Sequence, residues 1–273
     1  MNNFYTFYTK NFGKASETAF QLFWNADYER CYQFYSKIIY FAGSIEAMGF
    51  GDTLIYHHCS RQIGAEIFNT SKIPPPPSRH EIINLFNYEI SQEMSINRHS
   101  TRSILTQPSI INKAVLAAFI GIENGCEQAI ETGTFLGGSS YIFTGSFESV
   151  DTIEADPRLH ESSRIWLASN TKNAVCHLGN SSEILPQLIK NRTKKQLIFL
   201  DAHYSTGITS MEYGICPLLR ELEIIINSQI NAVIVVDDIR CMGTSGYPSL
   251  KEILDRIPEG RRATIHYDQL VIV

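Results

Sequence analysis

The chain has 273 residues, of which 44% are apolar and 19% charged, and its net charge at pH 7 is −5. Enough apolar side chains are present for a sizeable core, which excludes a disordered chain. No basic stripe is present, so we expect no nucleic-acid partner. No apolar run reaches the ~18 residues of a membrane span, so we expect no membrane partner either.

The six cysteines are scattered along the chain and form no CxxC pair, and the amino terminus has no signal-peptide core. This pattern is typical of reduced thiols in a cytosolic protein. We therefore expect a cytoplasmic location.

The first part of the chain, residues 1–106, is rich in Tyr, Phe and His. Tyr32, Tyr35 and Ile39 recur at the spacing of one helix face, and residues 81–93 repeat that spacing. We expect a mainly helical N-terminal extension, which would serve as a lid, as part of an acceptor pocket or as the contact of a homo-oligomer.

In residues 107–273 short apolar strands alternate with helices. Strands are predicted at 127–131, 150–154, 174–178, 197–200 and 232–236, with a terminal hairpin at 263–267 and 270–273. The alternation predicts an α/β domain with a Rossmann-like, doubly wound sheet. This sheet should be mostly parallel and should end in a C-terminal antiparallel hairpin.

Polar residues follow most of these strands. The first strand leads into the turn ETGTFLGGSS at 131–140, whose glycines let the backbone approach a ligand closely. The spacing is neither GxGxxG nor a P-loop, and a plain strand-to-helix turn is the alternative interpretation. Because ligands bind outside the carboxyl ends of such sheets, we expect the functional site at this edge.

An acid, Glu154, ends the second strand about twenty residues after this turn. A carboxylate at that position can accept hydrogen bonds from both hydroxyls of a ribose. Asp156 stands just before Pro157, which predicts an N-cap of the next helix.

From about Ala114 to its end the chain resembles the class I S-adenosylmethionine-dependent methyltransferases. The resemblance is carried by ETGTFLGGSS, IEADP, HLGNSSEIL, FLDAHYS and VVDDIR, which appear in that order. It implies S-adenosylmethionine as the cofactor, Glu154 on its ribose, and Asn180 and Ser181 beside its adenine. The methionine part would lie among Glu131, Gly133, Thr134 and Gly137.

Within that family, Asp201, Asp237 and Asp238 resemble the magnesium triad of metal-dependent sugar O-methyltransferases and cephalosporin-hydroxylase-like proteins. Three converging carboxylates repel one another unless a cation joins them, and oxygen ligands suit Mg²⁺. Adjacent strand residues point to opposite faces, so the alternative is that Asp237 or Asp238 is an unrelated cap.

The remaining candidate is His203, two residues after Asp201. The subgroup usually has Asp-Gly-Xaa-His, so DAHY departs from its pattern by one residue. A histidine beside a metal is suited to general-base catalysis, and a hydrogen-bonded structural histidine is the alternative. We expect His203 and Asp201 to be the catalytic residues.

Together these features predict an S-adenosylmethionine-dependent methyltransferase. The expected reaction is O-methylation of a small polyhydroxylated or sugar-like metabolite with Mg²⁺ assistance. Two alternatives stay open: a metal-dependent hydroxylase-like enzyme on the same fold, and a non-catalytic S-adenosylmethionine-binding protein.

Overall fold

A seven-stranded sheet in the order β3-β2-β1-β4-β5-β7-β6 forms the centre of the molecule. The computed structural model describes residues 14–42, 48–65, 73–84, 110–190, 192–202, 216–244 and 246–273. The strands are β1 (Gln128–Thr132), β2 (Val150–Glu154), β3 (Ala174–Leu178), β4 (Gln196–Leu200), β5 (Ala232–Val236), β6 (Ala263–His266) and β7 (Gln269–Ile272).

The first five strands are parallel, whereas β7 runs antiparallel to both β5 and β6. In the register of the sheet centre, Ala129 lies opposite Val150 on one side and Leu197 on the other. Every residue of β4 and β5 is buried, because helices cover both faces of a doubly wound sheet. The predicted fold class, including the C-terminal hairpin, is confirmed.

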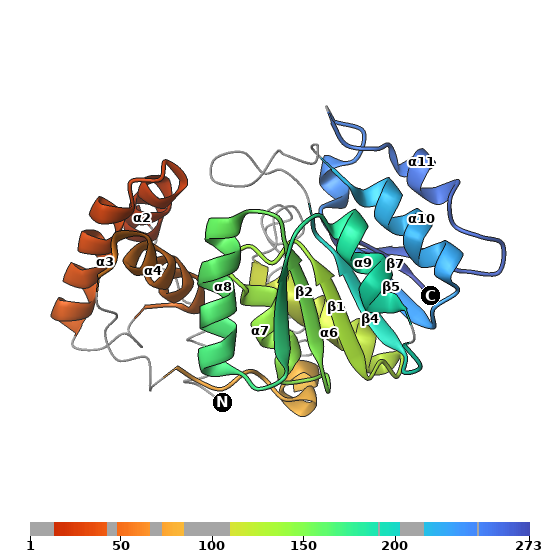
Figure 1. Cartoon of the computed structure of the whole chain (residues 1–273), viewed down its shortest axis with the longest axis horizontal. Coiled ribbons are helices and arrows are strands. Elements are labelled where there is room, and N and C mark those ends of the chain that lie inside the picture. The colour runs from red at the N-terminus through yellow and green to blue at the C-terminus, as the bar shows by residue number, and fades with distance from the viewer. Residues whose placement is uncertain are drawn as a thin grey trace, which may run out of the picture.

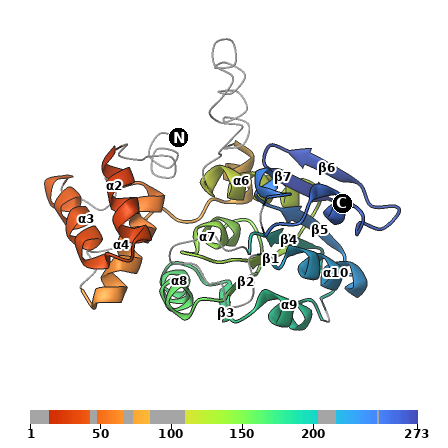
Figure 2. The same ribbon diagram turned by 90° about the horizontal axis from the view of Figure 1, so that it is seen from above.

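Described helices cover both faces of the sheet (Figures 1 and 2). One face carries α6 (Ile110–Glu123), α7 (Gly138–Thr144) and α8 (Pro157–Asn170), and the other α9 (Ser181–Ile189), α10 (Leu218–Ser228) and α11 (Leu250–Leu254). Each layer has its own apolar cluster, the first around Trp166 and Phe199 and the second around Ile198 and Leu222. None of the described helices is long and apolar enough to cross a membrane.

The helices α2 (Lys14–Trp24), α3 (Tyr28–Ala42) and α4 (Phe50–Ile63) lie together beside α8 (Figures 1 and 2). In α3, Tyr35 and Ile39 are buried, as the helical spacing predicts. The ring of His57 in α4 contacts Trp166 of α8 at a centroid distance of 5.4 Å. The expected boundary at residue 106 lies outside the described residues, so the division into two parts stays a prediction.

The segment between α4 and the sheet domain, residues 73–84, is held against α7. Tyr141 donates a hydrogen bond from its hydroxyl to the carbonyl of Pro74 at 2.7 Å. Arg79 donates to the carbonyl of Ser146 at 2.7 Å and to that of Cys126 at 2.5 Å. These bonds attach residues 73–84 to the layer of α7.

Candidate functional site

The strand order reverses between β1 and β4, which lie side by side at the centre of the sheet. Gly133 follows β1 and has φ of +86°, a conformation that glycine adopts without steric cost. A Cβ atom at Gly133 would stand 2.5 Å from the carbonyl oxygen of Asp201, which follows β4. Only glycine therefore allows these two strand ends to approach so closely, at the place where doubly wound sheets bind ligands.

Glu131 is fully buried beneath this turn. Its Oε2 atom accepts hydrogen bonds from the hydroxyl of Ser140 and, at 2.7 Å, from that of Thr152. Burial raises the pKa of Glu131 to about 7, and the two hydroxyls only partly oppose the shift. The side chain thus ties the start of α7 to β2 from inside the protein.

Thr134 also points inward, because its hydroxyl lies 2.6 Å from that of Thr152. Its carbonyl accepts a hydrogen bond from Gly137 at 2.8 Å, and Gly137 has φ of +83° as α7 begins. Thr134 and Gly137 thereby shape the turn. They present backbone atoms at the carboxyl edge of the sheet, because the threonine hydroxyl points inward.

Glu154 ends β2 and is 7% exposed. Its two carboxylate oxygens accept hydrogen bonds from the amides of Phe135 at 2.7 Å and Asp156 at 2.9 Å. Burial raises its pKa to about 7. Each oxygen retains a further lone pair, so the carboxylate can accept hydrogen bonds from a ligand's hydroxyls.

Two strand-end residues are helix caps. The side chain of Asp156 accepts hydrogen bonds from the amides of Arg158 and Leu159, which confirms the predicted N-cap of α8. Asn180 caps α9 in the same way, accepting from the amide of Ser182 at 2.9 Å. Ser181 is then the first residue of α9 and is buried.

The N-terminal helices reach this turn through aromatic rings. Phe135, which has φ of +51°, lies 6.0 Å from the ring of Phe23 and 6.3 Å from that of Trp24, between centroids. Both partners belong to the last turn of α2. The turn after β1 is therefore supported by side chains from the expected N-terminal extension.

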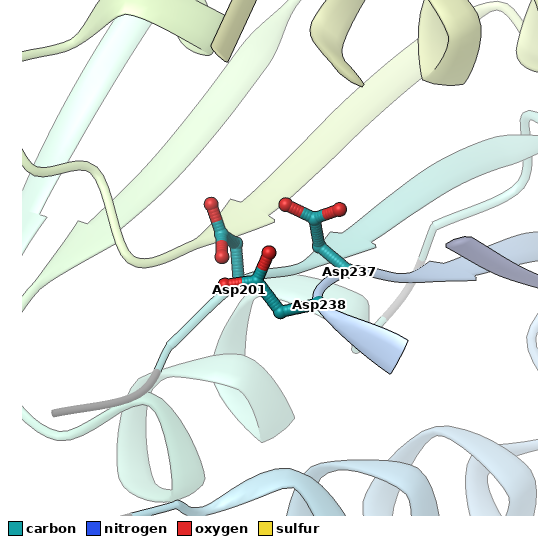
Figure 3. A group of neighbouring side chains, drawn as sticks. All are labelled: Asp201, Asp237 and Asp238. Carbon is teal, nitrogen blue, oxygen red and sulfur yellow. The ribbon is translucent and has the colours of Figure 1, made fainter. Parts of the chain in front are cut away.

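Asp201, Asp237 and Asp238 meet at the ends of β4 and β5 (Figure 3). Each offers one oxygen, and these oxygens all lie within 4.8 Å of one another. Asp238 has φ of +57° and makes no side-chain cap bond, so the chain turns just after the strand. This turn lets two adjacent residues direct their carboxylates to one place, which the alternation of a regular strand would prevent.

Within the described part of the chain, two cations contact this acidic cluster, defined here as Asp201, Asp237 and Asp238. Lys113 Nζ lies 2.8 Å from Asp237 Oδ2 and also pairs with Asp238. Arg240 Nη1 lies 2.6 Å from Asp238 Oδ1 and pairs with Asp268 as well.

The electrostatics of the cluster follow from this crowding. Burial, together with the neighbouring carboxylates, raises the pKa of Asp201 well above its usual range. Burial opposes the charge on Lys113, but Asp237, Asp201 and Asp238 outweigh it and raise the pKa of the ammonium. Burial also raises the pKa of Asp237, against the pull of Lys113.

The donor set fits a hard divalent cation, because it offers carboxylate oxygens only. Among the residues that the structure describes, these three are the group of His, Cys, Asp and Glu side chains close enough to share an ion. A metal there would have Lys113 as a direct competitor. His203 falls in residues 203–215, outside the described part of the chain, so its role stays a prediction.

Sequence reasoning missed Lys113, Asp268, Gln269 and Glu221. Lys113 lies in an apolar helix 124 residues before Asp237, and no local signal indicates their contact. Gln269 donates from its amide to the carbonyl of Lys113 at 3.1 Å and to Asp237 Oδ1 at 3.3 Å. Asp268, in the turn of the terminal hairpin, was visible only as a turn residue.

Glu221 of α10 is 1% exposed. Its Oε1 atom and the hydroxyl of Thr132 have no hydrogen-bond partner among the described residues. Burial raises the pKa of Glu221 to about 7, and the nearby Ser181 and Thr132 only partly oppose the shift. A polar position within an amphipathic helix predicts a solvated acid, so this burial could not be expected from the sequence.

No family model matches the sequence, and no curated protein matches it. Solved structures similar to this chain include O-methyltransferases. One is TomG from Streptomyces achromogenes, an O-methyltransferase in complex with S-adenosylmethionine, at 16% identity and TM-score 0.44, covering 68% of this chain and 94% of that one.

Two further similar structures come from other bacteria. A putative caffeoyl-CoA O-methyltransferase from Staphylococcus aureus is 18% identical with TM-score 0.43, covering 71% of this chain and 97% of its own. An O-methyltransferase from Bacillus cereus, bound to S-adenosylhomocysteine, is 17% identical with TM-score 0.43, covering 74% and 92%.

Proposed function

We propose that this protein is an S-adenosylmethionine-dependent methyltransferase that methylates a hydroxyl of a small polyhydroxylated or sugar-like acceptor with the assistance of Mg²⁺. One observation carries the proposal. The buried carboxylate of Glu154 is fixed at the end of β2 by two backbone amides and keeps lone pairs for a ligand. Glu154 stands beside the turn of Gly133, and this turn follows β1 at the reversal point of the sheet.

S-adenosylmethionine, when bound, supplies an electrophilic methyl group on a sulfonium. Glu154 would accept hydrogen bonds from the two ribose hydroxyls, and Asn180 and Ser181 at the start of α9 would border the adenine. Glu131, Gly133, Thr134 and Gly137 would shape the turn around the methionine part. In that turn Gly133 and Gly137 already have positive φ, which brings backbone rather than side chain to the edge.

Asp201, Asp237 and Asp238 would hold Mg²⁺, whose chemistry is to lower the pKa of an acceptor hydroxyl and fix its position. The convergence of three carboxylate oxygens within 4.8 Å supports this assignment. His203 would take the hydroxyl proton. Catalysis would then consist mainly of positioning and of charge stabilisation.

The N-terminal helices would complete the site or join two copies of the chain into a homo-oligomer. The contacts of Phe23 and Trp24 with Phe135 support a role next to the cofactor turn. A cytoplasmic location is part of the same proposal.

Calorimetry with S-adenosylmethionine and S-adenosylhomocysteine tests the cofactor assignment. Glu154→Ala should lose roughly tenfold or more in affinity, because charge-assisted hydrogen bonds contribute ~1.5–3 kcal/mol each. Glu161→Ala is the control. It removes an acid of α8 whose side chain is 50% exposed, and the affinity of this variant for the cofactor should match that of the wild type. Absence of binding by the wild type would contradict the proposal.

Mass spectrometry after incubation with cofactor, Mg²⁺ and a panel of hydroxylated acceptors tests the reaction. We expect one acceptor to gain a single methyl group. Cofactor binding with no turnover on any acceptor would favour a non-catalytic binding protein. In a parallel incubation with a redox-active metal ion, dioxygen and a two-electron reductant, a gain of oxygen would indicate the hydroxylase-like alternative.

A further inference from the structure

The acidic cluster already contains a cation that belongs to the chain. We propose that Lys113 is an internal cation that occupies the acidic cluster when no metal is bound, so that a divalent cation binds there only by displacing the Lys113 ammonium. This inference rests on the metal-binding part of the proposed function and is independent of the cofactor assignment.

The contacts of Lys113 place it on the metal-ligating oxygens themselves. Its Nζ atom lies 2.8 Å from Asp237 Oδ2, pairs with Asp238 Oδ1, and stands 3.8 Å from Asp268 Oδ2. The lysine side chain is only 11% exposed, and that of Asp237 is 0% exposed. Little water can therefore replace the ammonium if it leaves without another cation arriving.

The second cation, Arg240, does not take over this role. Its side chain is 39% exposed, and among the described residues it pairs with Asp238 and Asp268. The backbone amide of Arg240 also donates to Asp268 Oδ1 at 2.9 Å, which fixes it to the hairpin turn. Lys113 is the cation on Asp237 within the part of the chain that the structure describes.

The formal charges leave the cluster attractive to a further cation. Among the described residues, four carboxylates (Asp201, Asp237, Asp238 and Asp268) and two cations (Lys113 and Arg240) meet here. Four minus two leaves two formal negative charges once Asp201 and Asp237, whose pKa values are raised, release their protons. A divalent ion binds oxygen at roughly 2.0–2.6 Å, closer than the ammonium. The ion and the ammonium would then share the same oxygens and repel each other, so they exclude one another.

The geometry also gives Lys113 a way to leave. Its backbone is held, because Gln269 donates to its carbonyl at 3.1 Å, and α6 packs on the sheet. The ammonium, by contrast, sits on a flexible four-carbon stem. Displacement requires only a change of side-chain rotamers, with no movement of α6.

The consequence is a reduced apparent affinity for metal. A protein binds a ligand less tightly in proportion to the fraction of molecules in the competent state, and the state with Lys113 in the cluster is not competent. Removal of the ammonium should therefore tighten metal binding, whereas removal of an equal charge elsewhere should not.

Binding of Mn²⁺, measured by electron paramagnetic resonance, tests this directly. We expect Lys113→Met to bind Mn²⁺ about tenfold more tightly than the wild type. Lys194→Met is the matched control, because Lys194 pairs with Glu127 and Glu148 at the amino ends of the strands. Unchanged affinity in Lys113→Met, or no Mn²⁺ binding by any of the three proteins, would overturn the proposal.

A second measurement needs no variant, in case Lys113→Met does not fold. Reductive methylation with formaldehyde and a borohydride-type hydride donor modifies accessible lysine amines and is read by peptide mass spectrometry. Mg²⁺ should increase labelling of Lys113 severalfold and leave Lys194 unchanged. Labelling of Lys113 that does not rise with Mg²⁺ overturns displacement, and a failure of cofactor binding in calorimetry would leave both readouts unaffected.

Discussion

Two groups of buried acids stand at the same edge of the sheet and are stabilised differently. Glu131 and Glu154, on the β1–β2 side, accept hydrogen bonds from hydroxyls and backbone amides. Asp237 and Asp238, on the β5 side, are paired with Lys113 and Arg240. The first group has neutral partners and the second has cationic partners.

The difference indicates which ligand each group can bind. A carboxylate held by neutral donors has no paired cation, so hydrogen-bond donors such as ribose hydroxyls can bind it without displacing one. A carboxylate held by ammonium or guanidinium is already compensated, so its ligand must be another cation that replaces the first. Burial of a carboxylate charge with neither hydrogen-bond donors nor a paired cation would be costly.

The largest expected effect is that of replacing His203, and it shows whether His203 or an acid accepts the proton of the acceptor hydroxyl. In His203→Gln the side chain keeps its reach but cannot take a proton, so the methyl-transfer rate should fall by ~10²–10⁴. Cofactor affinity should be unchanged, and the wild-type rate should rise with pH through one ionisation below about 6.5 if a cation is near. Near-normal turnover of His203→Gln would assign the proton to a carboxylate of the acidic cluster.

The next effect comes from a substitution between the two groups, where the end of β1 meets the end of β4. Gly133→Ala introduces a Cβ atom 2.5 Å from the Asp201 carbonyl oxygen at φ of +86°. The clash and the left-handed backbone together should lower the free energy of unfolding by about 3 kcal/mol. Gly125→Ala, at φ of +71° with open space around it, should cost only about 1 kcal/mol in urea denaturation. Equal losses in both variants would show that the close approach is not needed.

A third prediction concerns a buried acid with an unpaired oxygen. Glu221 has a pKa of about 7 when folded and 4.5 as its ordinary value. Folding thus takes up a proton between these values, and stability should fall as pH rises from 4.5 through 7. Glu221→Gln removes this loss and should be more stable than the wild type by on the order of 2 kcal/mol at pH 8.5.

Thermal unfolding across pH values measures that effect. The advantage of Glu221→Gln should shrink toward zero at pH 4.5, where the wild-type acid is protonated in the folded state. A pH-independent difference would indicate a change of packing instead.

The smallest effect concerns the independence of the two groups, which is tested by changing one acid in each group and measuring the affinities for both ligands. Asp237→Asn removes one charge from the acidic cluster and should weaken Mn²⁺ binding about tenfold, about 1.4 kcal/mol, with unchanged cofactor affinity. Glu154→Gln should do the reverse. Asp255→Asn, an acid 58% exposed in its pair with Lys251, is the control and should change neither affinity. An effect of Asp237→Asn on both ligands would show that the groups are not independent.

Much of the fold could be predicted because the strands are short, apolar and separated by turn residues. β2, β3 and β5 begin and end at the predicted residues, β1 is shifted by one residue at both ends, and β4 begins one residue earlier than predicted. The capping role of Asp156 was predictable as well, since an acid before Pro157 is a local signal. Local patterns of this kind depend on neighbouring residues only.

The partners of the site could not be predicted for the opposite reason. Lys113 lies in a mostly apolar helix, and its contact with Asp238 spans 125 residues of sequence. The inward direction of the Thr134 hydroxyl depends on Thr152 in another strand. Such contacts arise from the packing of distant segments, and the spacing of residues within one segment carries no information about them.

The bond between Gln269 and the carbonyl of Lys113 joins segments 156 residues apart in the sequence. Closing so long a loop is entropically costly and slow, so contacts of this kind form late in folding. During synthesis α6 leaves the ribosome long before β7 does, and Asp237 emerges between them. The acidic cluster therefore acquires its full set of neighbours only when the C-terminal hairpin joins the sheet, which makes its assembly a marker of the completed fold.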